Sequence, residues 1–176
     1  MRPRPIVIVV GVAALFAGAC SEPRSAPQVH ASRTLEYQSL QQAARDADAV
    51  VEISVEKAGA VETVGRMPFT VTEARVVDVV KGRYDGTTVR LRQLGSAQGG
   101  GLVPEGELLQ AGKRYVAIVV PFTFGDFRPT GQHVVVGAWQ GLYRVEGDEL
   151  VATDAARTAL PRRLKRSSFV AAIAEP

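Results

Sequence analysis

The side chains that could do covalent or metal chemistry are few in this sequence. Cys20 is the only thiol, and His30 and His133 are the only imidazoles. These groups are too few for a histidine-rich metal site. The chain has neither the His-Glu-x-x-His pattern of zinc hydrolases nor the Gly-x-Ser-x-Gly turn of serine hydrolases. We therefore expect no metal, no cofactor and no enzymatic activity.

Two weaker catalytic candidates have simpler structural explanations. Ser96 follows a glycine, but no helical pattern comes after it to supply the N-terminal dipole that a phosphate or nucleophile site uses. The carboxylate pairs Asp46/Asp48 and Glu146/Asp148 fall at expected turns and helix ends. An unrecognised hydrolase is therefore the last of the alternatives.

The thiol of Cys20 lies at the end of a short apolar segment. Arg2 and Arg4 precede the uncharged residues 6–17. A helix needs about 20 residues to cross a bilayer, so this segment is too short. Its length and its basic start are typical of the apolar region of an export signal.

The residues Ala17-Gly18-Ala19-Cys20 resemble the lipobox of bacterial lipoproteins, with Ala17 where leucine is commonest. The resemblance implies that residues 1–19 are a cleaved signal peptide and that the Cys20 thiol carries diacylglycerol. Membrane lipid is then the implied partner. The implied location is the extracytoplasmic side of the cell membrane or outer membrane. A plain secretory signal and a retained membrane helix are the alternatives.

Cleavage would change the charge and the cysteine chemistry of the chain. The whole chain carries 21 basic and 18 acidic residues, a net charge of +3. Loss of Arg2 and Arg4 leaves 21 − 2 = 19 basic residues and a net charge of +1. Acylation of Cys20 leaves no thiol for a disulfide, so the fold must depend on its core. Residues 20–36 are rich in Ser, Pro and charge and are expected to form a flexible tether.

Periodicity predicts a mainly β body with a short helix at each end. Apolar residues at alternate positions indicate strands, and turn residues separate them. Residues 57–66 and 122–132 are expected to be loops, and Pro121 is expected to end a strand. A change of parity near residues 73–77 predicts a β-bulge or a strong coil of the strand. The expected helices are 39–47 and one from Ser168, and the expected strands are 49–56, 69–81, 88–94, 115–120, 133–137, 142–146 and 149–153.

The fold expected from this pattern is a small antiparallel OB-like barrel, with a β-sandwich as the alternative. Alternation places Val51 and Ile53 inside and Glu52 in solvent. It also places Arg90 and Arg92 together on the wet face, where an OB barrel could bind a single nucleic acid strand. Few aromatic residues fall on that face and export removes the protein from nucleic acid, so we expect no nucleic-acid partner.

Three short patterns carry a further resemblance. Ala47-Asp48-Ala49, Val80-Lys81-Gly82 and Gly112-Lys113-Arg114-Tyr115 resemble those of a group of exported bacterial domains. That group is similar to the OB-like barrel of netrin and metalloproteinase-inhibitor modules. The resemblance implies the fold, whereas the cysteines of inhibitor chemistry are absent here.

Two sets of residues are candidates for binding. The aromatic residues Phe122, Phe124, Phe127 and Trp139 could line a binding surface, or could instead plug the end of the barrel. The basic residues Arg162, Arg163, Lys165 and Arg166 could contact an anionic surface, or could instead form a solvated linker.

The expected organisation is a signal peptide (1–19), an acylated tether (20–36), a β-barrel domain (37–154) and a basic segment with a helix (155–176). The expected function is that of a membrane-anchored cell-envelope lipoprotein, a non-enzymatic binding or assembly module with an unidentified envelope protein as its partner. An inhibitor-type or small-ligand-binding barrel that acts on an exported enzyme is the alternative.

Overall fold

The computed structural model describes residues 36–64, 67–97, 106–124, 128–153 and 159–174. Cys20 and the expected tether lie outside these ranges. The described part is mainly β, with a short helix near each end, as the sequence predicted. None of its helices is long and apolar enough to span a bilayer. The elements are α1 (Leu40–Arg45), β1 (Ala49–Ser54), β2 (Ala60–Val64), β3 (Met67–Gly82), β4 (Thr88–Leu94), β5 (Arg114–Phe124), β6 (Arg128–Val135), β7 (Leu142–Glu146), β8 (Glu149–Ala152), β9 (Arg163–Lys165) and α2 (Arg166–Ala174).

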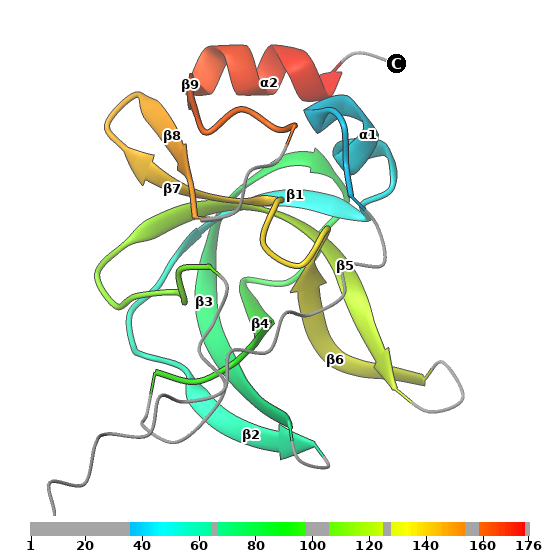
Figure 1. Ribbon diagram of the computed structural model, residues 1–176, viewed down its shortest axis with the longest axis vertical. Helices are drawn as coiled ribbons and strands as arrows, with labels where there is room; N and C mark the ends of the chain where they lie inside the picture. The colour runs from blue at the N-terminus through cyan, green and yellow to red at the C-terminus, as the bar shows by residue number, and fades with distance from the viewer. Residues whose placement is uncertain (1–35, 65–66, 98–105, 125–127, 154–158, 175–176) are drawn as a thin grey trace, which may run out of the picture.

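The strands β1, β3, β4, β6 and β5 close into a ring (Figure 1). Each pairs with the next, and β5 returns to pair with β1. All of these pairs are antiparallel except β4 and β6, which run parallel and share the single pair Leu91↔His133. One sheet that returns to its first strand confirms the OB-like arrangement and differs from the two facing sheets of a sandwich.

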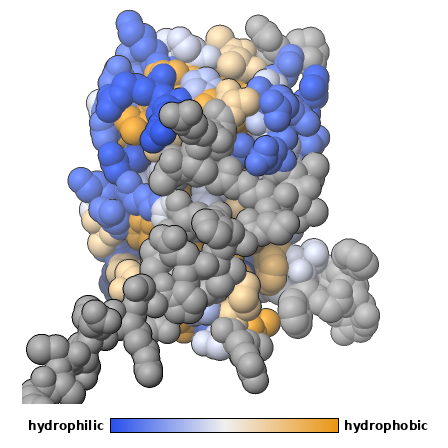
Figure 2. Space-filling model, in the orientation of Figure 1, coloured by the Kyte–Doolittle hydropathy of each residue, from blue (hydrophilic) through white to orange (hydrophobic). Residues whose placement is uncertain are grey.

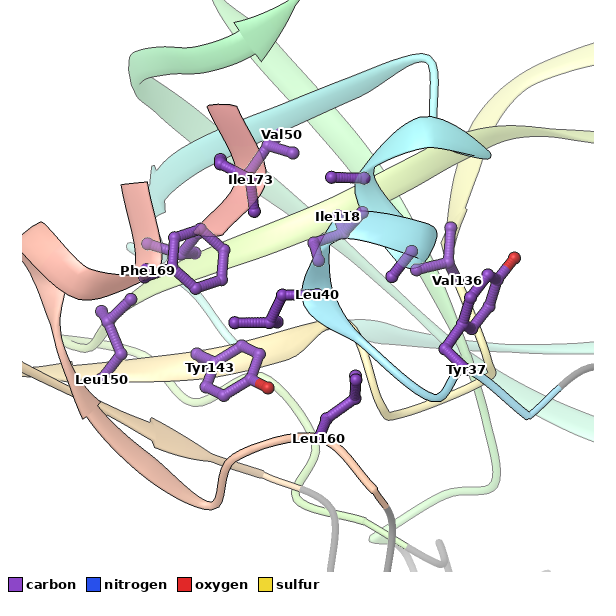
Figure 3. Packing of buried hydrophobic residues seen from close by; sticks show 13 residues of the cluster. Tyr37, Leu40, Val50, Ile118, Val136, Tyr143, Leu150, Leu160, Phe169 and Ile173 are labelled. Carbon is purple, nitrogen blue, oxygen red and sulfur yellow. The ribbon is translucent and has the colours of Figure 1, made fainter. Parts of the chain in front are cut away.

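Apolar side chains pack on both faces of this sheet. Val51 and Ile53 of β1 belong to a cluster inside the ring, as the alternation predicted. Their neighbour Val50 belongs to a second cluster, outside the ring and beneath the two helices (Figure 3). Phe169 and Ile173 bring α2 into this outer cluster. The C-terminal segment is therefore part of the same core as the ring.

The second core explains an incorrect prediction. Glu52 was expected in solvent but is fully buried. A strand that is covered on both faces does not alternate between buried and wet positions. The outer cover comes from α2, which is distant from β1 in the sequence, so the local pattern around Glu52 held no sign of it.

The helix ends are held by specific contacts. Ser39 caps α1 as predicted, because its Oγ accepts a hydrogen bond from the backbone N–H of Gln42 at 3.1 Å. Helix α2 begins at Arg166 and not at Ser168. At its C-terminal end, Nζ of Lys81 donates to the carbonyl oxygen of Ile173 at 2.6 Å. A cation is favourable there because it meets the negative end of the helix dipole.

The residues that carry the resemblance to exported domains have structural roles. Ala49 pairs with Gly82 where β1 and β3 meet. Gly82 has φ +77°, and a side chain there would collide with the carbonyl oxygen of Asp48. Gly112 has φ +78°, and its N–H donates to the carbonyl oxygen of Val55 at 2.8 Å. These positions hold β1 against β3 and β5.

Two further predictions about elements were wrong. Residues 57–66 were expected to be a loop, but Ala60–Val64 form β2, which pairs with the start of β3. Pro121 was expected to end its strand, but β5 continues to Phe124. The carbonyl of Val119 accepts the N–H of Asp48, just before β1 begins. The backbone nitrogen of Pro121, two residues later, points to the same side of β5 but lies beyond the end of β1. No carbonyl of β1 therefore loses a hydrogen bond because Pro121 has no N–H.

The predicted bulge in the long strand is confirmed. The pairing of β1 with β3 shifts register between Glu52 and Ile53, and the partner strand steps there from Asp78 to Val76. Val77 is therefore the extra residue, at the edge of the predicted range. Such a bulge bends the strand and helps it to turn a corner of the ring.

Candidate functional site

The aromatic residues predicted as a binding surface do not share one surface. Trp139 is only 2% exposed, which fits a residue packed inside the fold better than one on a binding surface. A Cβ at Gly106 would lie 2.8 Å from Cδ2 of its indole, which shows how closely the backbone covers the ring. Phe122 is half-buried. The side chain of Phe124 and all of Phe127 lie outside the described residues.

Two of the four residues of the basic run form ion pairs within the described part of the chain. Arg163 forms an ion pair with Glu149 and a weaker one with Glu146, whose closest atoms are 3.4 Å from its guanidinium. Arg166 pairs with the buried carboxylate of Glu52. Arg162 and Lys165 are exposed. Hydrophilic side chains predominate on the face of β7, β8 and β9 seen in Figure 2. Contact with an anionic surface stays a prediction, and it now depends on Arg162 and Lys165.

Glu52 is the most deeply buried charge in the described part of the chain. It lies on β1, and its two carboxylate oxygens form ion pairs with different arginines. Arg114 reaches Oε1 from the start of β5, and Arg166 reaches Oε2 from the start of α2. A buried carboxylate needs such partners, because leaving water costs several kcal/mol per ion. Glu52 therefore fastens α2 to the outer face of the ring.

Arg92 forms a second buried cluster on the opposite side of the fold. The alternation placed it in solvent, but it is 7% exposed. Its guanidinium carbon lies 4.9 Å from the ring centroid of Phe69 and 4.7 Å from that of Phe122. Nη2 donates to Glu62 Oε2 at 2.6 Å, and Nε donates to Gln132 Oε1 at 2.5 Å. The cluster joins β2, β3, β4, β5 and β6, and it spans the contact where β4 and β6 share one pair.

A groove opens at the end of the ring that lies away from the helices. Its volume is about 530 Å³, within the range of ligand-binding pockets. Small and apolar side chains provide most of its lining, and Leu108 and Leu109 are the largest of the apolar ones. Thr70, Ser96 and Glu107 provide polar groups. We name it the mouth groove, and its lining residues are Ala58, Gly59, Val61, Thr70, Ser96, Ala97, Glu107, Leu108, Leu109, Gln110 and Ala111.

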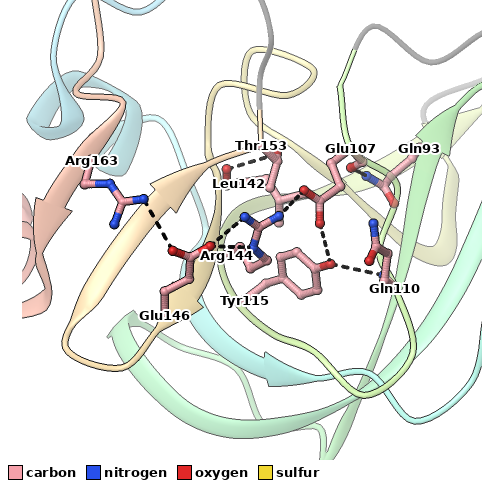
Figure 4. Close-up of polar contacts among 9 residues, drawn as sticks. All are labelled: Gln93, Glu107, Gln110, Tyr115, Leu142, Arg144, Glu146, Thr153 and Arg163. Atoms are coloured by element: carbon pink, nitrogen blue, oxygen red, sulfur yellow. Dashed lines mark hydrogen bonds and ion pairs between the residues drawn. The ribbon is translucent and has the colours of Figure 1, made fainter.

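A hydrogen-bond network fixes the acidic side of the mouth groove (Figure 4). The hydroxyl of Tyr115 donates to Glu107 Oε1 at 3.0 Å and accepts the backbone N–H of Gln110 at 3.1 Å. Burial raises the pKa of Tyr115 to about 12, so the hydroxyl keeps its proton at neutral pH. The other oxygen of Glu107 pairs with Arg144. The carboxylate is thus already satisfied, which suits a structural role better than acid–base catalysis.

A second groove lies on the outer face of β3 and β4. Its volume is about 420 Å³, and charged side chains of both signs line it together with small apolar ones. Glu62 is shared between Arg92 and Arg90, with Arg90 at 3.5 Å. Glu56 lies 3.8 Å from Arg75. We name it the polar groove, and its lining residues are Glu56, Lys57, Ala58, Ala60, Glu62, Val71, Glu73 and Arg90.

Strand β2 separates the two grooves, and together they form the candidate site. The site offers apolar contact on one face of β2 and balanced charges on the other. In the described ranges no three His, Cys, Asp or Glu side chains are grouped so that they could hold a metal ion. The arrangement is suited to binding an extended or small amphipathic partner.

One titratable group near the ring contact makes stability depend on pH. Burial lowers the pKa of His133 from its ordinary value of 6.5, and the Asp48 charge opposes this only in part. As the pH falls through about 6.5, the unfolded chain binds a proton that the folded chain resists. Stability is then lost with a slope of up to about 1.4 kcal/mol per pH unit.

We therefore expect His133→Phe to reduce the loss of stability on acidification from pH 7.5 to 5. Urea unfolding gives the free energy of unfolding of both proteins at the two pH values. The loss between pH 7.5 and 5 is then compared between wild type and variant. Equal losses in wild type and variant would contradict the assignment to His133.

The sequence did not reveal this site, because β2 was interpreted as a loop. The signal was weak but present: residues 60–64 read Ala-Val-Glu-Thr-Val, in which three of five residues are β-branched. The glycines that flank it favoured a connection. The clustering of Arg92 with Phe122 has no local signal, because the two residues are distant in sequence.

Comparison with protein-family models and with curated proteins transfers no site to this chain. No protein-family model and no curated protein to which it was compared matches it.

Proposed function

We propose that this protein is a lipid-anchored, extracytoplasmic binding or assembly module of the bacterial cell envelope that has no catalytic activity of its own. The observation that carries the proposal is the position of Cys20. It directly follows Ala17-Gly18-Ala19 and the apolar residues 6–17, with two arginines before them. This order is that of a lipoprotein signal. Such an anchor would hold the β domain at a membrane surface.

The arrangement of buried charges supports a binding role over catalysis. Glu52, Arg92 and Glu107 each lie in ion pairs or hydrogen bonds that join separate segments of the chain. Charges used in this way hold the fold and are not poised for proton transfer. The candidate site around β2 offers surface for recognition instead. The partner proposed is an envelope protein, besides the membrane lipid.

Replacing Cys20 with alanine tests the anchor. We expect wild-type protein expressed in bacteria to incorporate radioactive palmitate and to fractionate with membranes. Cys20→Ala should lose both properties completely, because no other thiol is present. Ser21→Ala is the matched control and should behave as wild type. Mass spectrometry of the mature protein should find a lipid-modified cysteine at its first position. An unmodified thiol, or membrane fractionation that Cys20→Ala does not change, would refute the proposal.

A second candidate function is the binding of a small molecule in the mouth groove. Its volume of about 530 Å³ and its apolar lining favour this alternative. Native mass spectrometry of the purified protein would then find a copurifying ligand. Ala58→Trp, which fills the exposed rim of the groove, should abolish that ligand. Protein of the expected mass alone would exclude the alternative.

A further inference from the structure

Strand β2 pairs with β3 on one side, and on its other side it pairs with no strand of the described ranges. We name this second side the free edge of β2. It lies at the opposite end of the molecule from α1 and α2 (Figure 1). A free edge presents unpaired backbone groups that can pair with another chain. Proteins commonly protect such edges with proline or lysine, but β2 contains neither.

The register shows which backbone groups face outward. The carbonyl of Pro68 accepts the N–H of Gly95, so residue 68 points toward β4. Its neighbour Phe69 therefore points toward β2, where it pairs with Glu62. Backbone groups alternate in direction along a strand. The N–H and C=O groups of Val61 and Thr63 thus point away from β3, to the free edge.

The two grooves lie on either face of this edge. Val61 lines the mouth groove, whereas Ala60 and Glu62 line the polar groove. Val61 is 40% exposed, and Met67 at the same hairpin is 38% exposed. A strand added beside β2 would place alternate side chains on these two faces. Strand addition gains affinity from the backbone and specificity from such alternate contacts.

The charges indicate what the added strand carries. On the polar side the ion pairs Glu56–Arg75 and Glu62–Arg90 balance one another. An occupant with a strong net charge on that side would repel one member of each pair. Its side chains there are therefore uncharged and polar, and its alternate side chains are apolar against Val61.

A second copy of this chain fits the edge poorly. In an antiparallel pair of two β2 strands, only one register uses both outward-facing residues of each copy. In that register Val61 of one copy pairs with Thr63 of the other, and Thr63 pairs with Val61. That register places the two Glu62 side chains directly opposite each other. Like charges in directly opposite positions destabilise a strand pair.

We propose that the free edge of β2 docks an extended segment of a partner protein, in which apolar residues alternate with uncharged polar ones. The segment pairs with the backbone of Val61 and Thr63, and its apolar side chains lie on the mouth-groove side. The proposal rests on the binding role proposed above and deepens it, but it does not depend on the lipid anchor.

The first test uses the mature full-length protein in detergent micelles and a displayed library of nine-residue peptides. The library alternates Val, Ile or Phe with Thr, Ser or Asn. We expect selected peptides to bind wild type at least tenfold tighter than Thr63→Pro. Proline removes the outward N–H of residue 63 and no bond to β3, so the thermal midpoint should stay near that of wild type. Thr63→Val is the matched control and should bind as wild type.

The second test leaves the protein unchanged, which keeps the proposal falsifiable if Thr63→Pro does not fold. Two N-methylated forms of the tightest-binding peptide are prepared. One is methylated at its odd-numbered residues and the other at its even-numbered residues. One form should lose at least tenfold in affinity and the other should retain it, because one edge of the peptide faces β2. Equal affinities for the two forms, no enrichment in the selection, or equal binding to Thr63→Pro would overturn strand docking. The lipid-labelling experiment would be unaffected.

Analytical ultracentrifugation tests whether a second copy of this chain occupies the edge of β2 instead. A dimer of wild type that Thr63→Pro converts to monomers would overturn the partner proposal in favour of a second copy. Monomers in both proteins, together with peptide binding to wild type, would support the proposal.

Discussion

Glu52→Gln is expected to destabilise the protein by about 1 to 3 kcal/mol, the cost of leaving partly buried charged donors without their acceptor. Arg114 and Arg166 both lose their contact with this carboxylate, and Arg166 keeps only the longer pair with Asp78 at 4.0 Å. The amide that replaces it keeps the size but not the charge. The loss should fall first on α2, which Arg166 begins.

Chemical denaturation of purified wild type and variant gives the free energy of unfolding directly. Glu56→Gln is the matched control, because Glu56 lies on the same segment but is exposed, and its pair with Arg75 spans 3.8 Å. Surface pairs of this kind contribute about 0 to 1 kcal/mol. A Glu52→Gln variant no less stable than Glu56→Gln would show that Glu52 does not hold α2 in place.

Arg92→Lys should cost about 2 to 3 kcal/mol although it keeps the positive charge. Lysine cannot reproduce the planar stack between Phe69 and Phe122, and it cannot donate to Glu62 and Gln132 at the same time. Each stacked ring contributes about 0.5 to 2 kcal/mol, and a charged hydrogen bond contributes about 1.5 to 3. The sum is reduced because lysine retains part of each contact.

The unfolding free energies of Arg92→Lys and Arg90→Lys measure this difference. Arg90 is the control on the same strand. It contacts the same Glu62 at 3.5 Å, and its side chain is about half exposed. Its replacement should change stability by less than about 0.5 kcal/mol. Equal effects at the two positions would mean that the stack of rings on Arg92 contributes nothing.

The sequence predicted the class of fold, most strands and the cap on α1, because these follow from local alternation and local hydrogen bonds. It misplaced Glu52 and Arg92 for one shared reason. Alternation identifies the two faces of a strand, but not whether a distant segment covers the second face. For Glu52 that segment is α2, and for Arg92 it is the pair of rings from β3 and β5.

Other positions were hard to predict because the structural effect of the residue depends on its neighbours in the fold. Pro121 breaks a ladder only where a neighbouring strand needs its N–H, and beyond the end of β1 none does. Trp139 follows Gly137 and Ala138, both at positive φ, and the sequence left open whether it lines a binding surface or plugs the end of the barrel. The tight turn directs the indole inward. The Cys20 anchor lies outside the described residues, so it stays a prediction from the sequence.

The closure of the ring by β1 and β5 sets the order in which the chain can fold. The hydrogen bond from Tyr37 to Gln140 joins residues 103 positions apart, and that from Lys81 to Ile173 joins residues 92 apart. High contact order of this kind slows folding, because the chain loses the entropy of closing long loops before stabilising contacts form. The buried carboxylate on β1 cannot meet Arg166 until nearly the whole polypeptide has been synthesised. The chain is therefore expected to reach its folded state only after its last residues are available.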